Sequence, residues 1–172
     1  MKRNSTIKNL FMVVALTFVI SPAFAAGAAG VGELRHLTEI LKDGQAGYQM
    51  ASSDVIDLKL KTLFQGYGEQ RAKFLTELRE EVARLGGDPD EGGSVKGALH
   101  RGWINARTAV TKNDDKVVVD EVLRGEEAAL KGYQETLAKD LPKSARKLVE
   151  DQRKAIQGAY DSVKQIDLKQ EK

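Results

Sequence analysis

The apolar residues of this chain recur every three or four positions, which is the spacing of an amphipathic helix. The pattern predicts a short helix over 94–111 and four long helices over about residues 33–53, 54–85, 114–137 and 142–166. No segment alternates apolar and polar residues with the two-residue period of a strand. The sequence therefore predicts an all-α protein whose long helices pack as a four-helix bundle.

The lengths of the connections predict how the helices run. Asp54 resembles a helix start signal, so the first two long helices are joined tightly and lie antiparallel. The last two are joined just before Pro142, which falls in the first turn of the final helix, and they also lie antiparallel. The path from Gly86 to Asp114 is long enough to travel the length of the bundle. The second and third bundle helices would then run parallel through a long, partly helical crossover, which is the ferritin-like arrangement.

The N-terminus has the features of a secretory signal peptide. Basic residues precede an apolar run of about 11 residues, and the small-residue site Ala23-Phe24-Ala25 follows. A bilayer-spanning helix needs roughly 20 apolar residues, so a membrane anchor is the weaker interpretation. We expect a periplasmic or secreted protein with three parts: a cleaved signal peptide (1–25), a flexible Gly/Ala tail (26–32) and one helical-bundle domain (33–172).

Composition excludes several kinds of chemistry. The chain has 27 Lys+Arg and 25 Asp+Glu, and three of the basic residues lie in the leader, so the mature net charge is −1. A chain this close to neutral is not expected to bind nucleic acid. The absence of cysteine excludes disulfides, thiolate metal sites and thiol nucleophiles. Neither a serine-nucleophile elbow nor a phosphate-binding glycine loop occurs, so we expect no enzymatic activity.

Polar residues interrupt the apolar stripe of every long helix near its middle. Burying such groups without partners costs roughly 1–3 kcal/mol each, so we expect them to meet in one layer across the core. One interpretation is a structural layer in which an Arg–Glu ion pair is flanked by glutamines. The other is a ligand site in the bundle core. The residues of this layer are Gln45, Gln70, Arg71, Glu126 and Gln152.

The residue types disfavour a two-metal carboxylate centre. Such a centre takes a Glu from each of two helices and Glu-x-x-His from each of the other two. The chain contains no Glu-x-x-His, Gln45 is neutral, and Arg71 would repel a cation. We therefore expect no cofactor, with iron or manganese binding as the alternative. The weak candidate ligands for that metal are Glu69, His100, Glu126 and Glu127.

Four segments together resemble a known family. They are Leu-Lys-Asp-Gly-Gln-Ala-Gly-Tyr at 41–48, Arg-Leu-Gly-Gly at 84–87, Gly-Ala-Leu-His-Arg-Gly-Trp at 97–103 and Arg-Gly-Glu-Glu-Ala-Ala-Leu at 124–130. The chain resembles, over residues 33–168, a bacterial family of ferritin-like four-helix-bundle proteins of unknown function. The resemblance implies a ferritin-like fold and no assigned activity. The chain departs from the family pattern in its leader and in Gln45, where members often carry Glu.

Two functions are compatible with these observations. The first is an exported, non-enzymatic bundle that acts through its surface, as an envelope stress-related protein, a protein-binding module or a homo-oligomer. The second is a metal-binding ferritin-like protein that holds iron or manganese through Glu126 together with Glu69, Glu127 or His100. The polar layer in the core decides between them, because it is either satisfied internally or open to a ligand.

Overall fold

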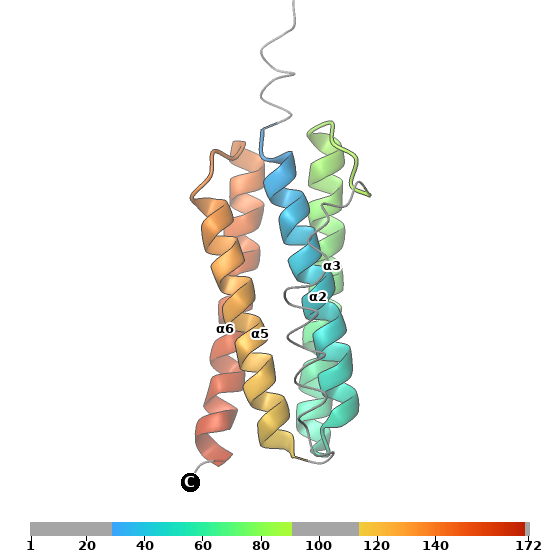
Figure 1. Ribbon diagram of the computed structural model, residues 1–172, viewed down its shortest axis with the longest axis vertical. Coiled ribbons are helices and arrows are strands. Elements are labelled where there is room, and N and C mark those ends of the chain that lie inside the picture. Colours follow the sequence, from blue (N-terminus) through green and yellow to red (C-terminus); the bar gives the residue numbers. More distant parts are fainter. Residues whose placement is uncertain (1–28, 91–113, 171–172) are drawn as a thin grey trace, which may run out of the picture.

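The computed structural model describes residues 29–90 and 114–170, in which there are four helices and no strand. This confirms an all-α protein consistent with a helical bundle (Figure 1). The helices are α2 (Val31–Asp54), α3 (Leu58–Arg84), α5 (Asp115–Leu137) and α6 (Lys143–Gln170). The predicted signal peptide, the predicted helix over 94–111 and His100 lie outside the described residues. In the described residues, no helix is both long and apolar enough to cross a membrane.

The helix ends differ from the predicted ones by a few residues. Helix α2 begins at Val31, inside the predicted tail, and continues through Asp54. The N-cap of α3 is therefore Asp57, whose carboxylate accepts hydrogen bonds from the backbone N–H groups of Lys59 and Leu60. Asp54 is not the start of a helix, because the polypeptide is still hydrogen-bonded as α2 at that position.

Helix α3 ends just before Gly86, as the sequence predicts. This residue has a φ of 81°, in the left-handed region that favours glycine. The backbone N–H of Gly87 then donates to the carbonyl of Val82 at 2.9 Å, which closes the last turn of the helix. The sequence therefore locates this helix end correctly.

The helix directions follow from which ends meet. The carboxylate of Asp115, at the start of α5, accepts hydrogen bonds from Ile56 N at 2.7 Å and Asp57 N at 2.9 Å. The turn between α2 and α3 therefore lies beside the start of α5. Figure 1 shows α2 and α3 running antiparallel, α5 and α6 running antiparallel, and α3 and α5 running in the same direction. The path from α3 to α5 lies outside the described residues.

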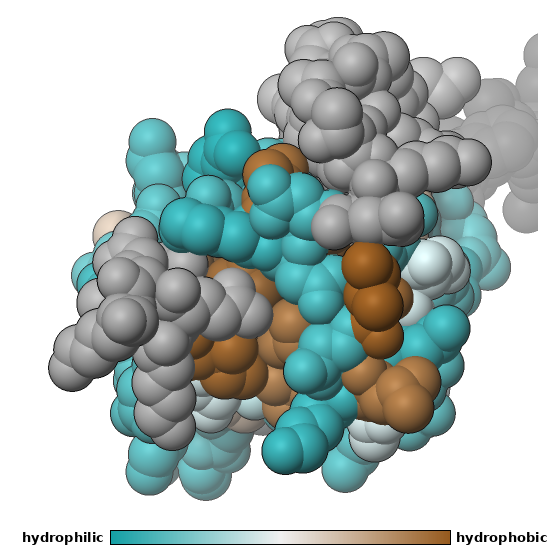
Figure 2. All heavy atoms as spheres, turned by 90° about the horizontal axis from the view of Figure 1, so that it is seen from below, coloured by the Kyte–Doolittle hydropathy of each residue, from teal (hydrophilic) through white to brown (hydrophobic). Residues whose placement is uncertain are grey.

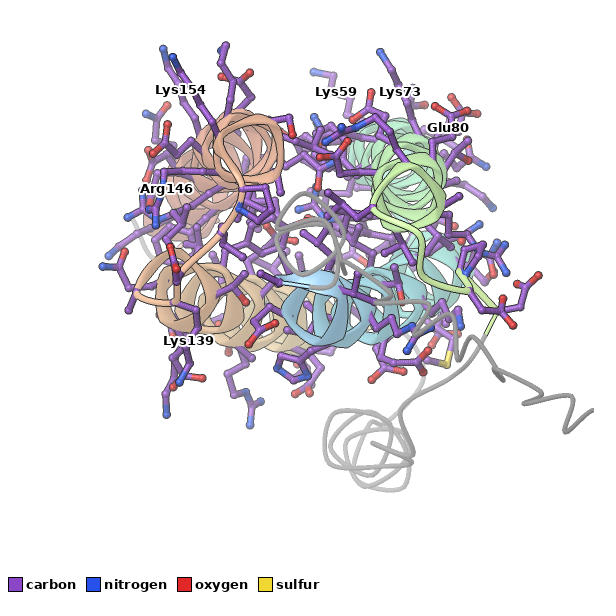
Figure 3. All side chains as sticks on the ribbon, turned by 90° about the horizontal axis from the view of Figure 1, so that it is seen from above. Lys59, Lys73, Glu80, Lys139, Arg146 and Lys154 are labelled. Carbon is purple, nitrogen blue, oxygen red and sulfur yellow. The ribbon has the colours of Figure 1, made fainter. Side chains whose placement is uncertain are left out.

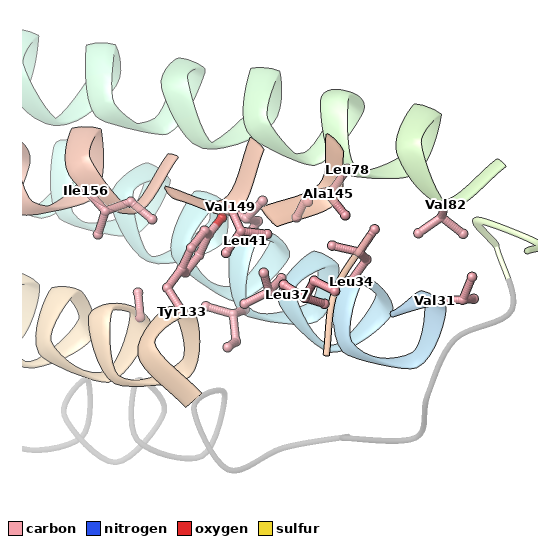
Figure 4. Packing of buried hydrophobic residues seen from close by; sticks show 13 residues of the cluster. Val31, Leu34, Leu37, Leu41, Leu78, Val82, Tyr133, Ala145, Val149 and Ile156 are labelled. Carbon is pink, nitrogen blue, oxygen red and sulfur yellow. The ribbon is translucent and has the colours of Figure 1, made fainter. Parts of the chain in front are cut away.

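Two apolar clusters fill the core, one in each half of the bundle. The first contains Leu34, Leu78, Tyr133 and Val149 and fills the half where α2 begins (Figure 4). The second contains Phe64 and lies toward the α2–α3 turn. Its other buried members are Tyr48, Ala51, Val55, Leu60, Val118, Val119, Val122 and Val163. Two of the polar residues predicted on the apolar stripes, Arg71 on α3 and Glu126 on α5, lie between these clusters.

One apolar stripe is corrected by the structure. The three- and four-residue spacing of apolar residues in the predicted helix 142–166 favours Leu148 and Ala155 on its buried face, but in α6 the fully buried residues at this level are Val149 and Ile156. Leu148 and Ala155 are half-buried because they lie at the edges of the stripe. Charged side chains point away from the bundle, as Figure 3 shows for Lys59, Lys73 and Lys154.

Candidate functional site

A buried ion pair lies between the two apolar clusters. Nη2 of Arg71 on α3 donates to Oε1 of Glu126 on α5 at 2.7 Å and to Oε2 at 2.6 Å. The two residues are 1% and 3% exposed. The hydroxyl of Tyr48 on α2 donates to the same Oε1 at 2.8 Å. Three helices therefore contribute to this polar layer, and both carboxylate oxygens of Glu126 are hydrogen-bonded.

The surroundings hold the Arg71 guanidinium in place. A Cβ atom at Gly44 would lie 3.8 Å from Cγ and Cδ of Arg71, an ordinary van der Waals contact, so the stem of the arginine runs beside α2 at this position. The guanidinium carbon lies 5.5 Å from the ring centroid of Tyr48 and 6.0 Å from that of Phe74, both favourable for a cation. Nη1 of Arg71 donates to Oε1 of Gln70. The positive charge of Arg71 is thus balanced by Glu126, its guanidinium is hydrogen-bonded to Glu126 and Gln70, and it lies near two aromatic rings.

Gln152 is buried, but it belongs to a separate cluster. Its Oε1 accepts a hydrogen bond from the Tyr133 hydroxyl at 2.8 Å. Its Nε2 donates to the carbonyl of Phe74 at 3.1 Å and to Oε2 of Glu77 at 2.9 Å. This cluster ties α6 to α3 and α5 within the first apolar half of the bundle. The expectation that Gln152 joins Arg71 and Glu126 in one layer was wrong.

Gln45 does not join the layer either. It is half-buried and makes none of the contacts described above. The residues that α2 contributes are Gly44, which lies beside the stem of Arg71, and Tyr48, whose hydroxyl donates to Glu126. Sequence reasoning missed both tyrosines, Tyr48 and Tyr133, because their rings fit an apolar stripe while their hydroxyls satisfy a buried polar group.

The candidate metal ligands are not gathered around Glu126. Glu69 and Glu127 are exposed, and Glu127 accepts a hydrogen bond from the Tyr160 hydroxyl at 2.9 Å. His100 lies outside the described residues. Within residues 29–90 and 114–166, no group of three or more His, Asp or Glu side chains could hold a metal ion.

A small cavity adjoins the ion pair. Its volume is about 20 Å³, which is enough for about one water molecule and too small for an organic substrate. Glycines on two helices, Gly44 and Gly125, line this cavity together with Tyr48, Arg71 and Glu126. The arrangement can therefore hold a water beside the charged pair, and it offers no unoccupied acid, base or nucleophile to a substrate.

The two buried phenols make the stability of the fold sensitive to high pH. Burial raises the pKa of Tyr48 well above its ordinary value, and the neighbouring Glu126 carboxylate raises it further. Burial likewise raises the pKa of Tyr133. The folded protein then keeps both phenol protons at a pH where the unfolded chain loses them. This stabilisation is complete below pH about 10, the ordinary tyrosine pKa, and is lost as the pH rises above it.

We therefore expect the free energy of unfolding, measured by urea titration, to fall as the pH rises from 10 to 12, with a slope that approaches about 1.4 kcal/mol per pH unit for each buried phenol. Tyr133→Phe should reduce this slope. Tyr160→Phe is the matched control, since Tyr160 is only half-buried. Equal slopes for the two variants would contradict the claim that the buried Tyr133 hydroxyl contributes to the pH dependence of stability.

Comparison with known proteins places the chain in a family. Residues 30–139, which are 110 of the 172 residues, match the model of a domain of unknown function (DUF2383). The match covers α2, α3 and α5, includes Arg71 and Glu126, and ends before α6. The chain matches none of the curated proteins. The chain therefore belongs to the DUF2383 family, whose shared domain has no known function.

Proposed function

We propose that the protein is an exported, non-enzymatic, ferritin-like bundle that acts through its surface by binding a protein partner. Export is supported by the charged, apolar and small-residue regions of the N-terminal 25 residues. The ferritin-like topology is supported by the parallel directions of α3 and α5, since bundles of this class have one long crossover (Figure 1).

One observation carries the proposal: the buried carboxylate of Glu126 is neutralised within the protein. Arg71 binds both of its oxygens, at 2.7 Å and 2.6 Å. A metal ion at Glu126 would have to displace the guanidinium, which would then remain buried without a counter-charge. Such a loss of one partner from a buried pair costs about 3–5 kcal/mol. The core layer thus supports a structural role, and the function is assigned to the surface.

Ile56 supports a partner-binding surface. It is 61% exposed in the turn between α2 and α3, at the end of the bundle where α5 begins. Leu58, two residues further along the chain, is 77% exposed, and the two side chains together offer apolar area that a protein partner would bury. We assign partner binding to this end of the bundle.

The competing metal-binding function is tested by elemental analysis of the protein purified from the periplasm without chelator. We expect a mature chain that begins at Ala26, less than a tenth of an equivalent of iron, manganese or zinc, and no change in melting temperature when these ions are added. Near-stoichiometric metal with a raised melting temperature would contradict the proposal. Glu127→Gln serves as the control for adventitious binding to an exposed carboxylate.

A further inference from the structure

The outer face of α3 carries an apolar groove along the first three turns of the helix. The groove has a volume of about 760 Å³, and the described residues that line it all belong to α3, with Leu58, Leu63 and Tyr67 as its apolar members. Leu58 is 77% exposed, whereas Leu63 and Tyr67 are half-buried. Figure 2, which views the bundle from the end with the α2–α3 turn, shows hydrophobic side chains at the surface between hydrophilic ones. The groove is apolar area that the described part of the chain leaves uncovered.

Gly66 lines this groove and has no packing role among the described residues. It is exposed in the interior of α3, where glycine destabilises a helix relative to alanine. A Cβ atom at Gly66 would meet nothing within 4 Å, so no neighbouring part of the described chain requires a glycine there. Contact with another molecule accounts for this glycine, because the lack of a side chain lets a second backbone approach closely.

Four exposed residues of α3 form a row along the groove. Lys59, Thr62, Gly66 and Glu69 follow one another at spacings of three and four, so they lie on one side of the helix. Figure 3 shows Lys59 and Lys73, which follows Glu69 in the same row, pointing away from the bundle. Among the described residues, neither Lys59 nor Glu69 has an ion-pair partner. The four-residue row thus has small residues at its centre and opposite charges at its two ends.

This row is complementary to itself when its direction is reversed. Two α3 helices related by a twofold axis run antiparallel, and an axis at the level of Phe64, the midpoint of the row, places Lys59 opposite Glu69 of the second copy. Thr62 then lies opposite Gly66 of the second copy, so the helices meet through small residues. Leu63 lies beside Leu63 of the second copy, and both become buried. A partner of a single charge would match only one end of the row, so the charges favour a second copy of this chain.

We propose that two copies of the protein form a dimer through α3, with Thr62 and Gly66 at the centre of the interface and a Lys59–Glu69 ion pair at each end. This inference goes beyond the proposed function and does not depend on it. The dimer uses the outer face of α3, whereas the separate partner was assigned to the end of the bundle where Ile56 is exposed.

Sedimentation over a range of protein concentrations tests the dimer directly. We expect the wild type to shift from monomer to dimer as its concentration rises. Gly66→Arg should raise the dimer dissociation constant about tenfold or more, because a long side chain keeps the two helices apart. Gly158→Arg is the matched control, since Gly158 is exposed in the interior of α6 and a Cβ atom there also meets nothing within 4 Å. A wild type that is monomeric at every concentration would leave the groove to another partner and would overturn the proposal, as would equal dissociation constants for the two variants.

Exchanging the charges identifies a second copy as the occupant. Lys59→Glu places two glutamates opposite each other at both ends of the interface, and Glu69→Lys places two lysines there, so each variant alone should dimerise about tenfold more weakly. A mixture of the two variants should form heterodimers about as tightly as wild type, because every glutamate then faces a lysine. Lys154→Glu, which reverses an exposed charge on α6, is the control and should dimerise like wild type. Heterodimers no tighter than the two variant homodimers, or unchanged affinity in both single variants, would contradict the proposed interface.

Discussion

Glu126→Ala is expected to lower the free energy of unfolding by about 3–5 kcal/mol, because it leaves a buried guanidinium without its counter-charge. Arg71 is 1% exposed and cannot reach water without disrupting the packing around it. The Tyr48 hydroxyl loses its acceptor as well. Neither loss is offset elsewhere, because Gln70 offers Arg71 only a neutral oxygen. Urea unfolding followed by circular dichroism measures the change.

Glu127→Ala is the matched control for this variant. Glu127 is the next residue on α5, but it is exposed and its carboxylate accepts a hydrogen bond only at the surface, from Tyr160. Its replacement should change the free energy of unfolding by less than about 1 kcal/mol. If Glu126→Ala and Glu127→Ala have the same unfolding midpoint, the ion pair is not buried in solution.

Gln152→Leu is expected to cost about 1–3 kcal/mol, although leucine fits an apolar core. The substitution removes the acceptor of the Tyr133 hydroxyl and the donor to Glu77 and to the Phe74 carbonyl. Gln152 is 1% exposed, so water cannot easily replace these partners. Thermal and urea unfolding measure the loss.

A second glutamine on α6 is the control for this variant. Gln157 is half-buried, and its side chain donates at the surface to Asp161, one turn further along α6. Gln157→Leu should change stability by less than about 0.5 kcal/mol. Equal stability of Gln152→Leu and wild type would show that the Gln152 hydrogen bonds contribute nothing to the fold.

The helices could be read from the sequence because their apolar periodicity coincides with strong stop signals. Gly86 is an example, because its left-handed backbone ends α3 where the sequence predicted the end. The start of α3 was less certain because Asp54 and Asp57 are both good N-cap residues. Only the structure shows that α2 continues through Asp54, which leaves Asp57 as the cap.

The partners within the polar layer were only partly predictable. Arg71 and Glu126 stood out because a charged residue on an apolar stripe needs an opposite charge. The prediction for Gln152 failed because the position of a residue along its own helix does not tell how far that helix is shifted along the bundle axis relative to its neighbours. Gln152 lies level with Tyr133 and Phe74, in the half of the bundle where α2 begins. Gln45 is half-buried, and on the same helix Tyr48, which is 3% exposed, supplies the hydrogen bond to Glu126.

The central claim, that Arg71 and Glu126 neutralise each other inside the core, is tested most directly by a double-mutant cycle. The free energies of unfolding are measured for the wild type, Arg71→Met, Glu126→Leu and the double variant. Each single variant leaves one charge buried alone, whereas the double variant leaves none. The account predicts that the double variant is more stable than either single variant, and less stable than wild type because Tyr48 still lacks an acceptor. Single losses that simply add in the double variant would contradict it.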